Sequence, residues 1–208
     1  MTLHMKHSNE ELFALIYRYY PRGVERHDPV IGTTEEYRRR VEVRRGVVAE
    51  YDRFRALLQR LRVMFPGSLV EDQGLYHPKG NFDACFSGKL VLPTLAPHQG
   101  QHALYFYASF LAPYYLLLSK RSVFLPRTQD VRGGHDCKKE TRHELTAEEQ
   151  PYAQAITEQI QATFGGDPLE PAVGRVIVPD LAVQDRPFGH VTINQCLFAL
   201  EGSVDEYA

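Results

Sequence analysis

Residues 103–119, ALYFYASFLAPYYLLLS, contain no charged side chain. A run of this length is close to the lower limit of about 17 residues for a helix that crosses a bilayer. Pro113 lies near its middle, and four tyrosines give it the aromatic content that is typical of strands. We therefore expect two buried strands that meet at Ala112 and Pro113, and no membrane association. A membrane-spanning helix is the alternative.

Helix starts are indicated by the capping-box pattern, in which a Ser or Thr and a Glu three residues later bond to each other's backbone amides. The pattern occurs at Ser8 with Glu11, Thr33 with Glu36, and Thr146 with Glu149. Apolar residues with helical spacing follow each of these positions. They predict three main helices, over residues 9–20, 34–65 and 147–164.

Runs rich in β-branched and aromatic residues predict strands over 68–77, 82–92, 102–111, 114–125, 174–180 and 190–200. Short turn-forming segments separate the first three runs, as consecutive antiparallel strands require. We therefore predict an α+β fold in which an antiparallel β-meander of about six strands packs against three main α-helices. No linker divides the 208 residues, so we expect one domain over 1–208.

The three cysteines are odd in number and far apart, which does not resemble a disulfide framework and favours a reducing compartment. The first residues contain no apolar run that could serve as a secretory signal. We therefore expect a cytoplasmic protein.

The stretch VRGGHDCKKETRHE, residues 131–144, contains His135, Cys137 and His143, three side chains that zinc accepts as ligands. Their spacing matches no common zinc motif, and the surrounding lysines and arginines repel a dication. We therefore expect a solvent-exposed connector, with a metal site as the alternative.

The chain lacks the usual phosphate-binding, dinucleotide-binding, metalloprotease and hydrolase motifs. Cys85 could act as a nucleophile with a nearby histidine, but its position in a predicted strand favours a buried core thiol. We therefore expect no catalytic residue and no cofactor. A small metal-dependent or cysteine-dependent enzyme is the alternative.

Charge is unevenly distributed along the chain. Residues 144–208 contain eleven acidic and two basic side chains, a local net charge of −9, whereas the whole chain carries −2. Such asymmetry favours association with an oppositely charged partner. Arginines along residues 34–65 offer a nucleic-acid interpretation, but glutamates and aspartates are interleaved with them. We therefore expect no direct contact with nucleic acid.

Several stretches together resemble small bacterial immunity proteins of polymorphic toxin systems, most nearly the immunity protein 52 family. They are YYPRG (19–23), TTEEYRRRVE (33–42), EQPYAQAITEQIQATFG (149–165) and the ending VGRVIVPDLAV…FGHVTINQCLF. The resemblance implies an α+β protein that binds and neutralises a cognate toxin, for that family typically a nuclease. A non-toxin adaptor or scaffold is the alternative, and homodimerisation stays open.

An inhibitor of a nuclease needs a surface that complements the basic groups with which the enzyme holds phosphates. The acidic third of the chain is therefore the predicted toxin-binding surface. Its predicted residues are Glu148, Glu149, Glu158, Asp167, Glu170, Asp180 and Asp185.

Overall fold

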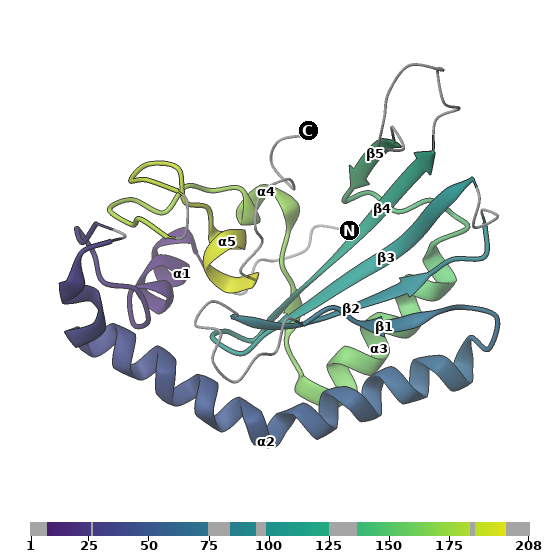
Figure 1. Cartoon of the computed structure of the whole chain (residues 1–208), viewed down its shortest axis with the longest axis horizontal. Coiled ribbons are helices and arrows are strands. Elements are labelled where there is room, and N and C mark those ends of the chain that lie inside the picture. Colours follow the sequence, from purple (N-terminus) through teal and green to yellow (C-terminus); the bar gives the residue numbers. More distant parts are fainter. Residues whose placement is uncertain are drawn as a thin grey trace, which may run out of the picture.

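The computed structural model describes residues 8–25, 27–74, 84–94, 99–124, 137–183 and 186–198. The protein is built around one β-sheet, with helices on both sides of it (Figure 1). The α+β class predicted from the sequence is confirmed.

Five strands of the sheet follow one another as an antiparallel meander: β1 (Val70–Asp72), β2 (Cys85–Val91), β3 (Gly100–Ser109), β4 (Tyr114–Phe124) and β5 (Cys137–Arg142). A sixth, β6 (Asp167–Pro168), pairs parallel to β4, so the prediction of a purely antiparallel sheet is wrong. Gly166 permits this pairing, because a Cβ there would lie 2.7 Å from the carbonyl oxygen of Pro113.

The last two predicted strands, 174–180 and 190–200, are also wrong. The first follows the short helix α4 (Pro171–Gly174) and makes only an isolated bridge from Ile177 to Thr192. Most of the second forms helix α5 (Ile193–Phe198), whose residues are all buried. Thr192 and Gln195 cap this helix reciprocally, with the Thr192 amide donating to Gln195 Oε1 at 2.8 Å.

The three predicted helices are confirmed, with shifted ends: α1 (Asn9–Ile16), α2 (Glu35–Met64) and α3 (Gln150–Phe164). Ser8 and Glu11 form the predicted capping box at α1. At α2 the cap is Thr34 rather than Thr33, because residues Pro29–Thr33 form a 3₁₀ helix, η1, that ends there. The Thr34 hydroxyl accepts a hydrogen bond from the Tyr37 amide.

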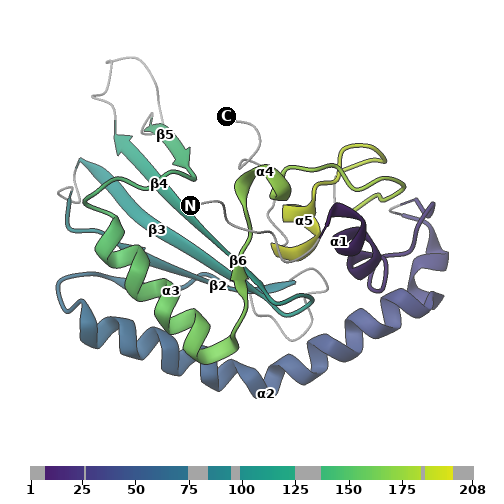
Figure 2. The ribbon, with the colours of Figure 1, turned by 180° about the vertical axis from the view of Figure 1, so that it is seen from behind.

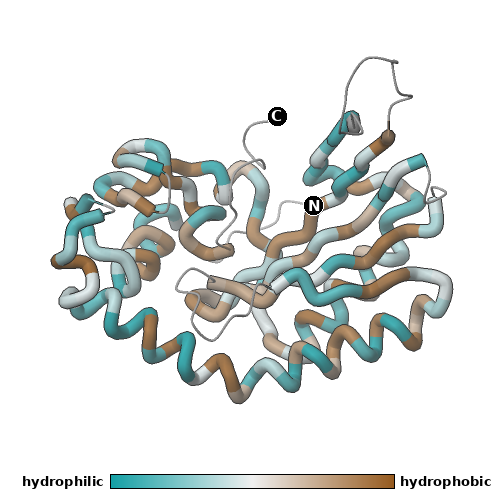
Figure 3. The backbone as a smooth tube through the Cα atoms, in the orientation of Figure 1, coloured by the Kyte–Doolittle hydropathy of each residue, from teal (hydrophilic) through white to brown (hydrophobic). Residues whose placement is uncertain are grey.

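Helices α2 and α3 cover one face of the sheet (Figure 2). Along α2 hydrophobic and hydrophilic residues alternate in the pattern of an amphipathic helix (Figure 3). Its buried residues meet α3 and the sheet in one apolar cluster that includes Phe54, Leu57, Leu61, Phe86, Leu90, Leu104, Phe106, Ile156 and Ile160.

Part of the opposite face packs against α1, α4 and α5 at the ends of β3 and β4 nearest the β3–β4 turn. This second cluster includes Leu12, Ile16, Tyr107, Leu116, Val173, Cys196 and Leu197. The two clusters use alternate residues of the same strands, as the two-residue period of a strand requires.

The charge-free stretch 103–119 forms parts of β3 and β4, which meet through residues 110–113. The predicted pair of buried strands is therefore confirmed. No helix within the described ranges is long and apolar enough to cross a membrane.

The sequence predicts a solvent-exposed connecting loop over residues 131–144, but the second half of this stretch contains a strand. Residues Cys137–Arg142 form β5, which pairs with Ser119–Phe124 of β4. Lys138, Lys139 and Glu140 are exposed there, as is usual at a sheet edge that must avoid pairing with other chains. Residues 131–136, including His135, lie outside the described ranges.

Candidate functional site

The predicted toxin-binding residues do not share one surface. Glu148 is exposed just before α3, and Glu158 is exposed in the middle of this helix. Asp167, in β6, and Glu170, just before α4, are half-buried on the stretch that follows α3. Asp185 lies outside the described residues.

Asp180 lies apart from α3, beside the end of α1. Its carboxylate binds the Arg22 guanidinium at 2.9 Å, and its carbonyl accepts a hydrogen bond from the Gly23 amide at 2.8 Å. The Tyr17 hydroxyl donates to the neighbouring Pro179 carbonyl at 2.9 Å. Two stretches that carry the family resemblance, YYPRG and GRVIVPD, are thus in contact, and Asp180 joins them.

Glu149 does not belong to the predicted surface, because its side chain is completely buried. It lies between α3 and the sheet, where it contacts β3 and β4. A carboxylate in that position has no access to a partner protein. Its role in the molecule is therefore internal, and the toxin-binding prediction for Glu149 is wrong.

Each oxygen of the Glu149 carboxylate has its own partners. Oε2 accepts a hydrogen bond from the Thr146 amide at 2.6 Å, which is one half of the predicted capping box. Oε1 lies 2.7 Å from His102 Nε2 and accepts a hydrogen bond from the Ser119 hydroxyl. Arg142 of β5 approaches the same oxygen at 3.6 Å. One side chain therefore ties the start of α3 to three strands.

The His102 ring continues this network to the surface, where its Nδ1 lies 2.8 Å from the hydroxyl of exposed Thr94. With the ring proton on Nε2, the ring donates to Glu149 and accepts from Thr94. A hydroxyl, an imidazole and a carboxylate in line have the composition of a nucleophile-activating triad. However, the ring is buried, and the Glu149 carboxylate is also held by the Ser119 hydroxyl and the Thr146 amide. We interpret the network as an anchor for α3.

Stability should depend on pH through this carboxylate. Burial alone would raise the pKa of Glu149, but hydrogen bonds from Ser119, Thr146 and His102 outweigh it and lower the pKa to about 2. A carboxylate whose pKa is lower in the folded protein than in the unfolded chain stabilises the fold at pH values above its unfolded pKa. This stabilisation is lost as the pH falls through the unfolded pKa toward the folded one.

Between pH 7 and pH 3 the protein should therefore lose about 2 kcal/mol of unfolding free energy through Glu149. Urea unfolding at several pH values measures the loss. The Glu149→Gln variant should lack this share of the pH dependence. If the two proteins lose stability in parallel below pH 4.5, Glu149 does not hold the charge assigned to it.

The structure shows where the cysteines and one of the histidines lie that the alternative enzyme interpretations require. The Cys85 thiol is buried and donates to the Phe198 carbonyl at 3.1 Å, which confirms it as a core thiol. Burial raises the pKa of Cys196 far above its ordinary range. His143 is half-buried beyond the end of β5. Within the described ranges, no three His, Cys, Asp or Glu side chains form a group that could hold a metal ion.

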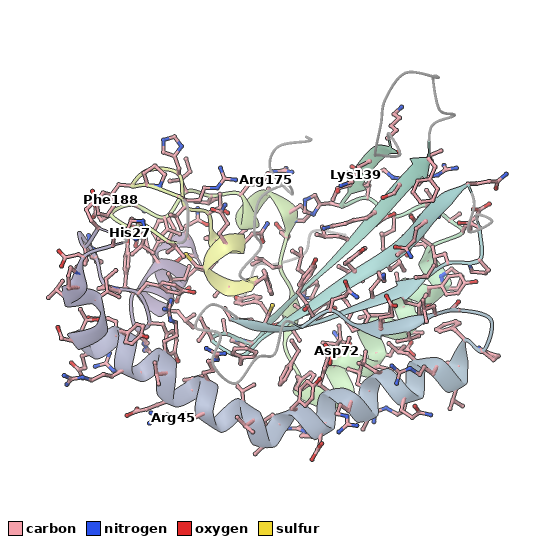
Figure 4. All side chains as sticks on the ribbon, viewed as in Figure 1. His27, Arg45, Asp72, Lys139, Arg175 and Phe188 are labelled. Carbon is pink, nitrogen blue, oxygen red and sulfur yellow. The ribbon has the colours of Figure 1, made fainter. Side chains whose placement is uncertain are left out.

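Three arginines of α2 make contacts with neighbouring elements. Arg53 donates to the Thr163 carbonyl at the end of α3, where a positive charge favours the helix dipole. Arg60 binds the Thr163 hydroxyl at 2.6 Å, and Arg62 donates to the Val70 carbonyl at 2.9 Å. Arg45 lies on the outer side of α2, whereas Asp72 lies between β1 and α2 (Figure 4). These contacts attach α2 to α3 and β1.

A second polar group lies on the sheet face opposite α2 and α3, and sequence analysis missed it. It consists of one side chain from each strand of the meander: Glu71, Lys89, Tyr105, Lys120 and Lys139, here called the lysine row. Lys89 binds Glu71 at 2.5 Å, and the Lys120 amine lies 4.7 Å from the centre of the Tyr105 ring. Three lysines and one glutamate give this part of the face a positive charge.

No family model, curated protein or solved structure matches the chain.

Proposed function

We propose that the protein is an immunity protein, which binds a cognate polymorphic toxin of the nuclease class and neutralises it in a tight protein–protein complex. On this proposal it makes and breaks no covalent bond, needs no cofactor, and contacts neither nucleic acid nor membrane directly. Two kinds of support lead to it. One is the resemblance of four stretches of sequence to immunity proteins, and the other is the charge on and around α3.

The observation that carries the proposal is the uniform charge of residues 143–174. This segment contains six carboxylates and no lysine or arginine. Only Glu149 among the six is buried, and Glu144, Glu148 and Glu158 are exposed. Helix α3 and β6 lie on the same side of the molecule (Figure 2). The proposed toxin-facing surface is therefore α3 with its two flanks, without Asp180.

A nuclease holds its substrate through basic groups that contact phosphates, and a fixed array of carboxylates can occupy the same groups. The Glu149 network fixes α3 on the sheet before any partner binds. Such preorganisation reduces the entropy lost on association. Opposite charges also speed the encounter, which matters for an inhibitor that must capture each toxin molecule.

Reversing charge on α3 tests the proposed surface. The double variant Glu148→Lys with Glu158→Lys should bind the cognate toxin domain at least about tenfold more slowly, because electrostatic steering is lost. Its association rate should also depend less steeply on salt. Stopped-flow or biolayer interferometry at several salt concentrations measures both effects.

The matched control reverses two carboxylates of α2, Glu42→Lys with Asp52→Lys, which change the net charge equally but lie on exposed positions of another helix. This control should associate at nearly the wild-type rate. If both double variants slow equally, only overall charge matters and α3 is not the interface. If wild-type protein neither binds nor protects cells from that toxin domain, the immunity function itself is refuted.

A further inference from the structure

Two lysines of the lysine row are shielded from solvent, but their surroundings differ. Lys89 is buried, with only 8% of its surface exposed, and its amine is paired with Glu71 and lies 3.5 Å from Gln101 Oε1. Lys120 is half-buried on the neighbouring part of the face. Lys89 thus has the carboxylate that a buried ammonium group requires.

Lys120 has no carboxylate partner among the residues that the structure describes. Its amine lies over the Tyr105 ring, and a cation–π contact is weaker than a buried ion pair. Burial lowers the pKa of Lys120, and the like charge of Lys139 on β5 lowers it further. The surrounding protein therefore does little to stabilise the charged form of the Lys120 amine.

The strand register surrounds Lys120 with small and polar side chains. Its direct neighbour on β3 is Ala103, and its direct neighbour on β5 is Thr141. Ser122 follows two residues later on the same face, opposite Gln101. The hydroxyls of Ser122 and Thr141 place hydrogen-bond donors on the face that also carries Lys120 and Lys139.

We propose that Lys120 and Lys139, with the hydroxyls of Ser122 and Thr141, form a binding site for an oxyanion, the phosphate or carboxylate group of a small molecule. A bound oxyanion gives the Lys120 ammonium group the negatively charged partner that it lacks. It also lies between the positive charges of Lys120 and Lys139. This face is opposite α3, so the site is distinct from the proposed toxin-facing surface and can be tested without any toxin.

Inorganic phosphate and citrate are the two probes, since they distinguish a phosphate source from a carboxylate source. Calorimetric titration of wild-type protein should give saturable binding of one of them. Lys120→Met, which keeps the aliphatic stem and removes the charge, should weaken binding at least about tenfold. Lys139→Met should weaken it by about threefold, because this amine is exposed.

The matched control is Lys138→Met, which removes the same charge from an exposed position of the same strand but on the other face. It should bind the probe like wild type. In lysines labelled with carbon-13, the pKa of Lys120 should rise by about one unit or more when the probe saturates. Equal weakening of binding by Lys138→Met and Lys120→Met would overturn the proposal. An unchanged Lys120 pKa in wild-type protein would also overturn it, and this result does not depend on whether Lys120→Met folds.

Discussion

Replacing Glu149 with glutamine is expected to lower the free energy of unfolding by about 3–5 kcal/mol. The carboxylate accepts hydrogen bonds from the Thr146 amide, the Ser119 hydroxyl and the His102 ring, all in a buried position. A glutamine amide replaces one of the two oxygens with a donor. Either the Thr146 amide then faces another donor, or the Ser119 hydroxyl and the His102 ring must both reverse their present roles. Equilibrium unfolding in urea, followed by circular dichroism, measures the difference.

The adjacent residue supplies the control. Glu148→Gln makes the same chemical change one position earlier, on an exposed side chain, and should alter stability by less than about 0.5 kcal/mol. Equal effects of the two variants would mean that the Glu149 carboxylate is not the anchor of α3. Because Glu149 lies inside, its variant should also loosen α3 and thereby weaken toxin binding, without removing any contact to the toxin.

The sequence predicts the local parts of this network but not its position in the fold. The capping-box pattern correctly pairs Thr146 with Glu149, since the two are three residues apart. Nothing local indicates that the second oxygen meets Ser119 and His102, which come from strands 30 and 47 residues away. Sequence reasoning therefore assigns the same residue to an acidic surface.

Predictions of secondary structure succeeded where local signals and packing agree, as in the three long helices. They failed for residues 190–200, where alternating apolar residues resemble a strand. A capping box at Thr192 and Gln195 was available in the sequence and marks the start of α5. Complete burial of this short helix removes the polar face by which a surface helix is normally recognised.

The lysine row escaped prediction for a further reason. Lys89, Tyr105 and Lys120 lie in three different strands, and they come together only in the register that the sheet adopts. A shift of one residue in any pair would move these side chains to opposite faces. The register is a property of the folded protein and is not encoded in any short segment.

The Gly88→Ala substitution, which adds one methyl group, is expected to lower the free energy of unfolding by about 3 kcal/mol. Gly88 lies opposite Phe106 in the β2–β3 pair, and a Cβ at this position would lie 2.3 Å from Cζ of the Phe106 ring. That ring is buried and packs against Phe54, so it has little freedom to move. The Gly88→Ala variant should unfold at clearly lower urea concentration.

A double-mutant cycle identifies the cause. Phe106→Leu alone should lower the free energy of unfolding by about 1–2 kcal/mol, because it leaves a space in the core. In the Phe106→Leu background, Gly88→Ala should then destabilise the protein less than it does in wild type, by about 1 kcal/mol or more. Gly67→Ala is the control, because a Cβ there meets no atom within 4 Å. Additive effects of the two substitutions would show that the ring of Phe106 is not what excludes a side chain at position 88, and hence that the sheet at β2 and β3 differs from the one described.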